Sequence, residues 1–125
     1  MKVLLVEDES ALADVLARSL RGRGEDVAVA GTADAALDEI KAALPDVLIV
    51  DVNLPDRTGW DILRRLSLEQ RMAVRVIVIS AAPISEKRIA EFQPLRHLQK
   101  PFPIGALVRL LGSTEPTLSP GGDAS

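Results

Sequence analysis

The sequence predicts an α/β fold, in which a single doubly wound sheet of five parallel strands lies between two layers of helices. Short apolar segments alternate with helical patterns, and most of these segments are continuously apolar. Such alternation is typical of parallel sheets, in which a strand buried on both faces is a continuous apolar run. The last segment is the most polar and suits an edge strand. The five segments are VLLV (3–6), VAVA (27–30), VLIV (47–50), VIVI (76–79) and RHLQ (96–99).

The first of five expected helices follows Ser10, which can cap it, and ends at Gly22 or Gly24. Thr32 is expected to cap the second helix, and Pro45 to end it. Apolar residues at helical spacing predict the buried face of each helix. They are Leu12, Val15, Leu16 and Leu20; Leu37, Ile40 and Leu44; Ile62, Leu63 and Leu66; a weaker pattern from Ile84 to Phe92; and Ile104, Leu107, Val108 and Leu111.

The size of the chain suits one globular domain with a real core, since it has 125 residues, of which 47% are hydrophobic. We expect this domain at residues 1–111. The segment GSTEPTLSPGGDAS (112–125) is rich in Gly, Ser and Pro, which predicts a disordered tail or the stump of a linker.

Composition excludes several classes of function. The absence of cysteine excludes disulfides, thiolate metal sites and a cysteine nucleophile, and it fits a reducing cytosol. The formal net charge is −3 with acids and bases interspersed, so we expect no direct binding of nucleic acid. No apolar run approaches the roughly 20 residues of a membrane span or the length of a secretory signal. We therefore expect a cytoplasmic protein without a membrane partner.

Polar side chains follow four of the five predicted strands. Glu7 and Asp8 follow the first strand, Asp51 the third, Ser80 the fourth and Lys100 the fifth. Right-handed crossovers bring the carboxyl ends of parallel strands to one edge of the sheet, where ligands bind. We therefore expect three carboxylates, a hydroxyl and an ammonium group to meet there.

This set of groups points to a divalent cation and to phosphoryl chemistry. Clustered carboxylates repel one another unless a cation neutralises them, and Mg²⁺ or Mn²⁺ prefers oxygen ligands. The sequence has no His/Cys cluster for zinc or copper. Ser80 and Lys100 provide the hydrogen-bond donor and positive charge that phosphoryl oxygens need. Asp51 is then the candidate nucleophile, as carboxylates are in aspartyl-phosphate chemistry.

Four segments in this order and spacing resemble the receiver domains of response regulators in two-component signalling. They are LLVEDE (4–9), LIVDVNLPDRTGW (48–60), VIVISA (76–81) and QKPF (99–102). The resemblance covers residues 2 to about 111. It implies a flavodoxin-like fold, similar to that of chemotaxis regulators, with the strand order 2-1-3-4-5.

The resemblance also assigns a role to each residue of the polar cluster. Asp51 would be the phosphoacceptor and, with Asp8, a direct metal ligand. Asn53 would bind the metal through its backbone carbonyl, and Glu7 would do so through a water molecule. Ser80 and Lys100 would bind the phosphoryl group.

Three further features come from the same comparison. His97 stands where a switch Tyr or Phe often lies in the family, so it is a candidate switch residue. The Lys100–Pro101 peptide bond would be cis. The segment from Ser80 to Lys100 is slightly shorter than usual and lacks the common Gly-Ala pair before the fifth strand.

The function implied is that of a phosphorylatable receiver, which accepts its phosphoryl group from a histidine kinase or a histidine phosphotransfer protein. The face made by the fourth helix, fifth strand and fifth helix would then change shape and meet a downstream protein or a second copy. Such a domain is not an enzyme, beyond self-phosphorylation from small donors and slow autodephosphorylation.

Two alternatives stay open at this point. A receiver-like module could serve only for docking or dimerisation, without phosphorylation. A haloacid-dehalogenase-type phosphatase also uses an Asp nucleophile, but Asn53 stands where its second, proton-transferring Asp belongs, and the chain has no cap insertion. Whether the chain acts alone or is cut from a larger regulator or hybrid kinase also stays open.

Overall fold

A computed structural model of the chain describes residues 1–93 and 96–112. It contains one five-stranded sheet in the order β2-β1-β3-β4-β5, with all neighbouring strands parallel. This confirms the predicted strand order and direction. The strands are β1 (Lys2–Val6), β2 (Asp26–Ala30), β3 (Val47–Asp51), β4 (Arg75–Ser80) and β5 (Arg96–Gln99).

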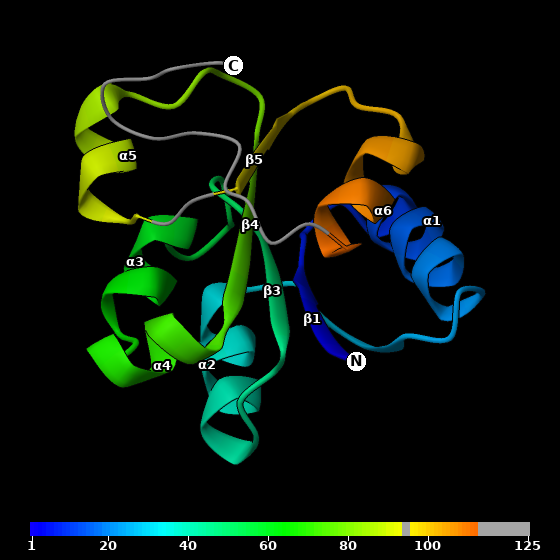
Figure 1. Cartoon of the computed structure of the whole chain (residues 1–125), viewed down its shortest axis with the longest axis horizontal. Helices are drawn as coiled ribbons and strands as arrows, with labels where there is room; N and C mark the ends of the chain where they lie inside the picture. Colours follow the sequence, from blue (N-terminus) through cyan, green and yellow to red (C-terminus); the bar gives the residue numbers. More distant parts are fainter. Residues whose placement is uncertain (94–95, 113–125) are drawn as a thin grey trace.

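Helices cover both faces of the sheet, as Figure 1 shows, so the predicted three layers are confirmed. On one face lie α1 (Ser10–Arg21) and α6 (Ile104–Gly112). On the other lie α2 (Ala33–Ala42), α3 (Gly59–Arg64), α4 (Leu68–Ala73) and α5 (Glu86–Glu91). Alternate residues of the central strands enter two separate apolar cores, because successive side chains of a strand point to opposite faces.

The described residues form six helices where five were predicted. The predicted third helix, marked by Ile62, Leu63 and Leu66, corresponds to α3, and α4 is an additional short helix that begins after Ser67. The Ser67 hydroxyl accepts the Gln70 N–H at 3.0 Å, and the Gln70 side chain accepts the Ser67 N–H at 2.9 Å. This reciprocal pair is a capping box, a local signal that starts a helix and that the spacing of apolar residues does not reveal.

Helix α1 differs from its prediction in two details. Glu9 is its N-cap residue, so the predicted cap at Ser10 is wrong, whereas the predicted end at Gly22 is confirmed. Val15 is 60% exposed, because the buried face is centred one position away from the predicted one. The buried residues of α1 are Ala13, Leu16, Ala17 and Leu20.

Helix α2 begins at the predicted cap. The Thr32 hydroxyl accepts the Ala35 N–H at 3.0 Å, which satisfies one of the free donors of the first turn. The helix ends at Ala42, three residues before Pro45.

The described part of the chain ends inside α6, at Gly112. The disordered tail predicted for the rest of 112–125 therefore lies outside the described residues. Within 1–93 and 96–112, none of the helices has both the length and the apolar character needed to cross a bilayer.

Candidate functional site

The carboxyl ends of β1, β3, β4 and β5 bring the predicted polar residues to one edge of the sheet. Glu7 directly follows β1, and Lys100 directly follows β5. Asp51 and Ser80 were expected just after their strands, but they are the last residues of β3 and β4. Asp51 is paired in register with Ile79, so its backbone is fixed by the sheet.

Three carboxylates converge at this edge. Glu7, Asp8 and Asp51 each offer an oxygen atom, and these atoms all lie within 4.8 Å of one another. Glu7 is only 2% exposed and Asp51 only 4%, whereas Asp8 is exposed. Negative charges so close together destabilise the fold unless a cation lies between them.

Lys100 provides part of the positive charge that these carboxylates need. Its Nζ lies 2.6 Å from Asp51 Oδ2 and 2.8 Å from Glu7 Oε1. Burial alone would lower the pKa of Lys100, but the attraction of the Asp51 and Glu7 carboxylates outweighs it and raises the pKa above its usual value. Lys100 is therefore a cation at neutral pH, and it faces three carboxylates with a single positive charge.

Glu7 retains an oxygen with unused coordination capacity. Its Oε2 accepts the Glu9 N–H at 3.2 Å. Its Oε1 is buried and, among the described residues, receives no well-aligned hydrogen bond, so the ion pair with Lys100 is its compensation. Burial raises the pKa of Glu7, although Lys100 and the Glu9 N–H oppose this. A buried oxygen in this state fits a site that receives a metal-bound water or a metal ion.

The loop of residues 52–58 fixes the Asp51 carboxylate from the other side. The Asn53 N–H donates to Asp51 Oδ1 at 2.9 Å. The Gly59 N–H donates to Val52 O at 2.8 Å and closes the loop. A β-carbon on Gly59 would lie 2.4 Å from the Asp51 carbonyl oxygen, so this glycine is needed for close approach of two backbone segments.

Ser80 and His97 are in direct contact. The Ser80 hydroxyl donates to the Ala82 carbonyl, and its oxygen lies 2.6 Å from His97 Nε2. Because a hydroxyl has one proton and the carbonyl can only accept, Nε2 must carry the proton and donate to Ser80. Burial lowers the pKa of His97.

A pocket of about 330 Å³ adjoins this edge on the side of α5. Asn53, Trp60 and Ser80 line it, together with the segment from Ala81 to Ser85 and Arg88. Trp60 also stacks on Phe92 just after α5, with ring centroids 5.2 Å apart and planes inclined by 16°. Trp60 thus borders the pocket beside Asp51 and also packs against the residue that follows α5.

One residue that supports the site was not identified from the sequence. Asp56, in the loop after β3, accepts the Ala33 N–H at 2.9 Å and the Asp34 N–H at 3.0 Å, both at the start of α2. An Asp in a turn is common, and nothing in the sequence indicated partners more than twenty residues earlier.

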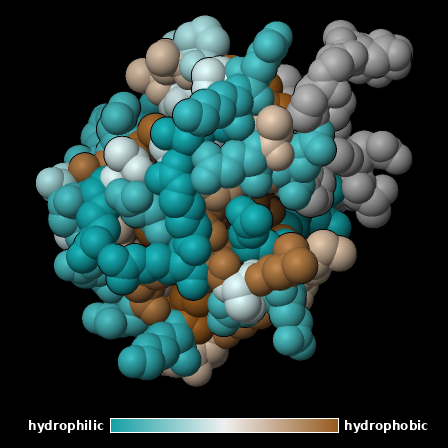
Figure 2. Space-filling view, turned by 90° about the vertical axis from the view of Figure 1, so that its left-hand side faces the viewer, coloured by the Kyte–Doolittle hydropathy of each residue, from teal (hydrophilic) through white to brown (hydrophobic). Residues whose placement is uncertain are grey.

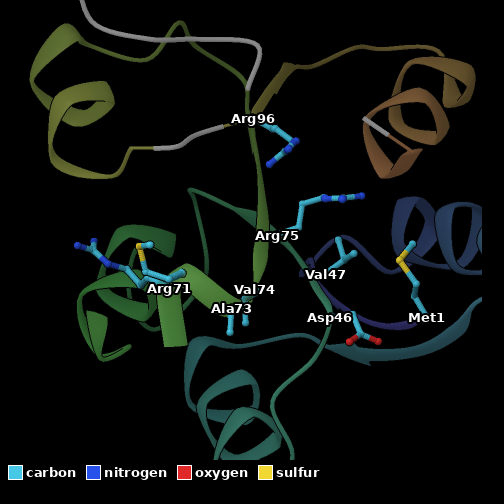
Figure 3. Close-up of a pocket in the computed structure, with 9 residues that line it drawn as sticks. Met1, Asp46, Val47, Arg71, Ala73, Val74, Arg75 and Arg96 are labelled. Atoms are coloured by element: carbon cyan, nitrogen blue, oxygen red, sulfur yellow. The ribbon is translucent and has the colours of Figure 1, made fainter. Parts of the chain in front are cut away.

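A second pocket, of about 490 Å³, lies at the opposite, amino-terminal edge of the sheet (Figure 3). Three arginines line it, and Asp46 is the carboxylate among its lining residues. The Asp46 side chain accepts the Lys2 N–H at 2.7 Å. This pocket contains none of the predicted site residues, which all lie at the carboxyl edge.

The geometry defines a class of protein, namely a doubly wound sheet with an acidic cluster and a lysine at its carboxyl edge. The family model of the response regulator receiver domain matches residues 3–111. This chain belongs to the response regulator receiver domain family, as the four sequence segments predicted.

Two curated relatives are similar over most of the chain. The KDP operon transcriptional regulatory protein KdpE of Escherichia coli K12 is 40% identical over 107 residues, which are 84% of this chain and 47% of KdpE. The "Probable transcriptional regulatory protein TcrX" of Mycobacterium tuberculosis is 34% identical over 108 residues, which are 85% of this chain and 46% of TcrX. The chain thus spans about half the length of these curated relatives.

Solved receiver domains share the fold. The receiver domain of the hybrid histidine kinase CckA has a TM-score of 0.75 and 29% identity, over 90% of this chain and 96% of that domain. The receiver domain of the Francisella response regulator 1452 has a TM-score of 0.75 and 30% identity, over 88% of this chain and 93% of that one. The chemotaxis response regulator CheY4 of Vibrio cholerae has a TM-score of 0.78 and 26% identity, over 89% of this chain and 95% of that one.

Proposed function

We propose that this receiver domain accepts a phosphoryl group on Asp51 from the phosphohistidine of a histidine kinase or a histidine phosphotransfer protein. The observation that carries the proposal is the position of the Asp51 carboxylate between a lysine and two further acids. Its Oδ2 is 2.6 Å from Lys100 Nζ, and Glu7 and Asp8 each bring an oxygen within 4.8 Å.

A divalent cation is part of the proposal, with Mg²⁺ or Mn²⁺ as its identity. Asp8 and Asp51 would bind it directly, Asn53 would contribute its backbone carbonyl, and Glu7 would act through a water molecule. The three carboxylates and the buried Glu7 Oε1 suit such an ion, since hard cations prefer oxygen ligands. When bound, the cation would neutralise negative charge on the carboxylates and on the transferred group.

In the proposed step, an oxygen of Asp51 forms a bond to phosphorus while the bond from phosphorus to the donor imidazole nitrogen breaks. The imidazole leaves as the neutral base after taking up one proton, and Asp51 becomes an acyl phosphate. The chain contributes positioning and charge, which are the main requirements of phosphoryl transfer. The Asn53 N–H orients the carboxylate, and Lys100 can pair with a phosphoryl oxygen.

Ser80 is the proposed trigger of the response. Its hydroxyl donates to Ala82 O in this structure, and it would turn to donate to a phosphoryl oxygen on Asp51. Since His97 Nε2 already contacts the Ser80 oxygen, His97 would move together with Ser80. This motion would pull on residues 81–85, which lead into α5.

The proposed output surface is the face formed by α5, β5 and α6, which correspond to the fourth helix, fifth strand and fifth helix of the sequence prediction. It would bind a downstream protein or a second copy of the chain. Figure 2 shows the side of the molecule that includes α5, on which hydrophilic residues predominate and hydrophobic ones form small groups. Because the curated relatives are named transcriptional regulators, we propose that the downstream response concerns transcription, without direct contact of this domain to nucleic acid.

The test is mass spectrometry after incubation with acetyl phosphate and Mg²⁺. The wild-type chain is expected to gain the mass of one phosphoryl group, and Asp51→Asn to gain none while remaining folded. Full labelling of Asp51→Asn would move the acceptor to another residue. No labelling of the wild type, by acetyl phosphate or by a phosphohistidine donor, would favour the docking-only module. Steady release of phosphate from many small phosphoesters would instead favour a phosphatase.

A further inference from the structure

The proposed metal-binding residues come from two separate segments of the chain. Glu7 and Asp8 follow β1, whereas Asp51 is the last residue of β3 and Asn53 lies in the loop after it. A cation held between them requires the two segments to keep a fixed separation, because coordination distances tolerate little variation.

Both segments are attached to the same third segment, residues 30–34, which runs from the last residue of β2 to the first turn of α2. The Glu7 N–H donates to Ala30 O at 3.0 Å. On the other side, the two oxygens of Asp56 accept the Ala33 and Asp34 N–H groups at 2.9 and 3.0 Å. Residues 30–34 therefore connect Glu7, which precedes Asp8, to the loop of residues 52–58.

We propose that Asp56 is a positioning residue for the divalent cation, which holds the loop of residues 52–58 at its working distance from Glu7 and Asp8. This inference rests on the proposed function, because it concerns the same cation. Asp56 touches none of the proposed ligands through its side chain. It acts through the loop that carries Asn53 and adjoins Asp51.

The simpler role for Asp56 would be to cap α2. That helix, however, already has its own cap, since the Thr32 hydroxyl accepts the Ala35 N–H. A neighbouring ion pair, 3.1 Å between Arg57 Nε and Asp34 Oδ1, joins the same loop to the same helix. The hydrogen bond from the Ala33 N–H is the largest influence on the pKa of Asp56 and lowers it. Burial opposes this and the Asp34 N–H adds to it, so the pKa lies below its usual value and the carboxylate is ionised at neutral pH.

The experiment is isothermal titration calorimetry with Mg²⁺ on the wild type, Asp56→Ala, Asp56→Asn and the matched control Thr32→Ala. Asp56→Ala is expected to raise the Mg²⁺ Kd about tenfold, the lower end of the loss usual for residues that orient metal ligands. Asp56→Asn should give a smaller rise, because its amide oxygen still accepts one N–H. Thr32→Ala removes a cap from α2 without touching the loop, so its Kd should stay within about twofold of wild type.

The outcomes separate the two proposals. If the wild type binds Mg²⁺ and Asp56→Ala binds it equally well, the positioning role is wrong and the proposed function stands. If the Kd for Mg²⁺ rises equally in Asp56→Ala and Thr32→Ala, Asp56 acts only as a cap of α2. If the wild type does not bind Mg²⁺, both proposals fail. If Asp56→Ala does not fold, Asp56→Asn decides, and its Kd must exceed that of Thr32→Ala.

Discussion

Ser80, the last residue of β4, and His97, in the neighbouring strand β5, share a hydrogen bond of 2.6 Å between the serine oxygen and the imidazole Nε2. The Ser80 hydroxyl also donates a hydrogen bond to the Ala82 carbonyl. The hydroxyl that would bind a phosphoryl oxygen is thus already engaged on both sides, and any response to phosphorylation must begin by redirecting it.

The first prediction follows from this arrangement. Ser80→Ala should still accept phosphate, because the reaction depends on Asp51, Lys100 and the cation. It should show little change in residues 81–93 and 96–100, since the group that pulls on them is missing. Hydrogen exchange on wild type and Ser80→Ala, each with a beryllofluoride adduct in place of the phosphoryl group, measures this. Equal changes in both proteins would show that Ser80 is not the trigger.

The second prediction concerns His97 and pH. Burial holds its folded-state pKa below the ordinary 6.5, so the unfolded chain binds more protons between these two values. The free energy of unfolding should therefore fall as pH drops through about 6.5. The contribution of His97 to this fall is at most about 1.4 kcal/mol per pH unit, and it should level off below the folded-state pKa. His97→Gln should lack this component. Urea denaturation of both proteins from pH 7.5 to 5.5 checks it, and parallel curves would contradict it.

The third prediction concerns the acidic cluster. Mg²⁺ should stabilise the unphosphorylated domain, by about 2.7 kcal/mol at a concentration one hundred times its Kd. Asp51→Asn should lose most of this effect, because it removes one of the crowded carboxylates. Asp38→Asn is a suitable control, since Asp38 is an exposed residue of α2. Thermal denaturation at constant ionic strength provides the measurement. If millimolar Mg²⁺ does not change the melting temperature of the wild type, the acidic cluster of Glu7, Asp8 and Asp51 is not a cation site.

The fourth prediction concerns Lys100. Lys100→Ala leaves Glu7 and Asp51 buried without their cation, so the metal-free domain should lose about 1.5–3 kcal/mol of stability, the range for a hydrogen bond to a charged group. Mg²⁺ should restore more stability to this variant than to wild type, since Lys100 no longer competes for the same oxygens. Denaturation in EDTA and in Mg²⁺ tests both statements. Lys100→Arg, which keeps the charge, serves as the control.

The fifth prediction concerns Gly59. A β-carbon there would overlap the Asp51 carbonyl oxygen, so Gly59→Ala should cost about 1–3 kcal/mol, as overpacking does, and should weaken Mg²⁺ binding by displacing Asp51. Gly105→Ala is the matched control in α6, where a β-carbon meets no atom within 4 Å. It should be neutral or stabilising by up to about 1 kcal/mol, because alanine favours helix. Equal effects of the two substitutions would contradict the close approach at Gly59.

The fold was predictable because strong local signals agreed with one another. Continuous apolar runs marked the buried strands, and the polar residues after them marked one edge of a parallel sheet, so Glu7, Asp51 and Lys100 could be brought together before any coordinates were known. The helices were less certain, because hydrophobic spacing alone does not fix a helical face. Val15 was assigned to the core of α1, whereas the small residues Ala13 and Ala17 lie there.

What could not be predicted depends on contacts between distant segments. The partners of Asp56 are 22 and 23 residues earlier in the chain, and the contact between Gly59 and Asp51 depends on the course of a loop. His97 was identified as a candidate switch residue by its position, but its existing bond to Ser80 depends on the side-chain conformations of two strands. The chemical roles of Asp51, Asp8, Asn53, Glu7, Ser80 and Lys100 stay predictions until the site is tested.

The stacking of Trp60 on Phe92 has a spectroscopic consequence. The chain has one tryptophan and no tyrosine, so its near-ultraviolet emission comes from Trp60. That indole lines the pocket next to Ser80 and Asn53, while its partner ring lies just after α5 beneath the guanidinium groups of Arg64 and Arg71, 5.5 and 5.4 Å from the ring centre. Quenching of its fluorescence is therefore expected to respond both to the proposed phosphorylation site and to the end of α5. The domain carries an intrinsic optical probe at the junction through which a signal would travel, and stopped-flow emission can time that signal without a label.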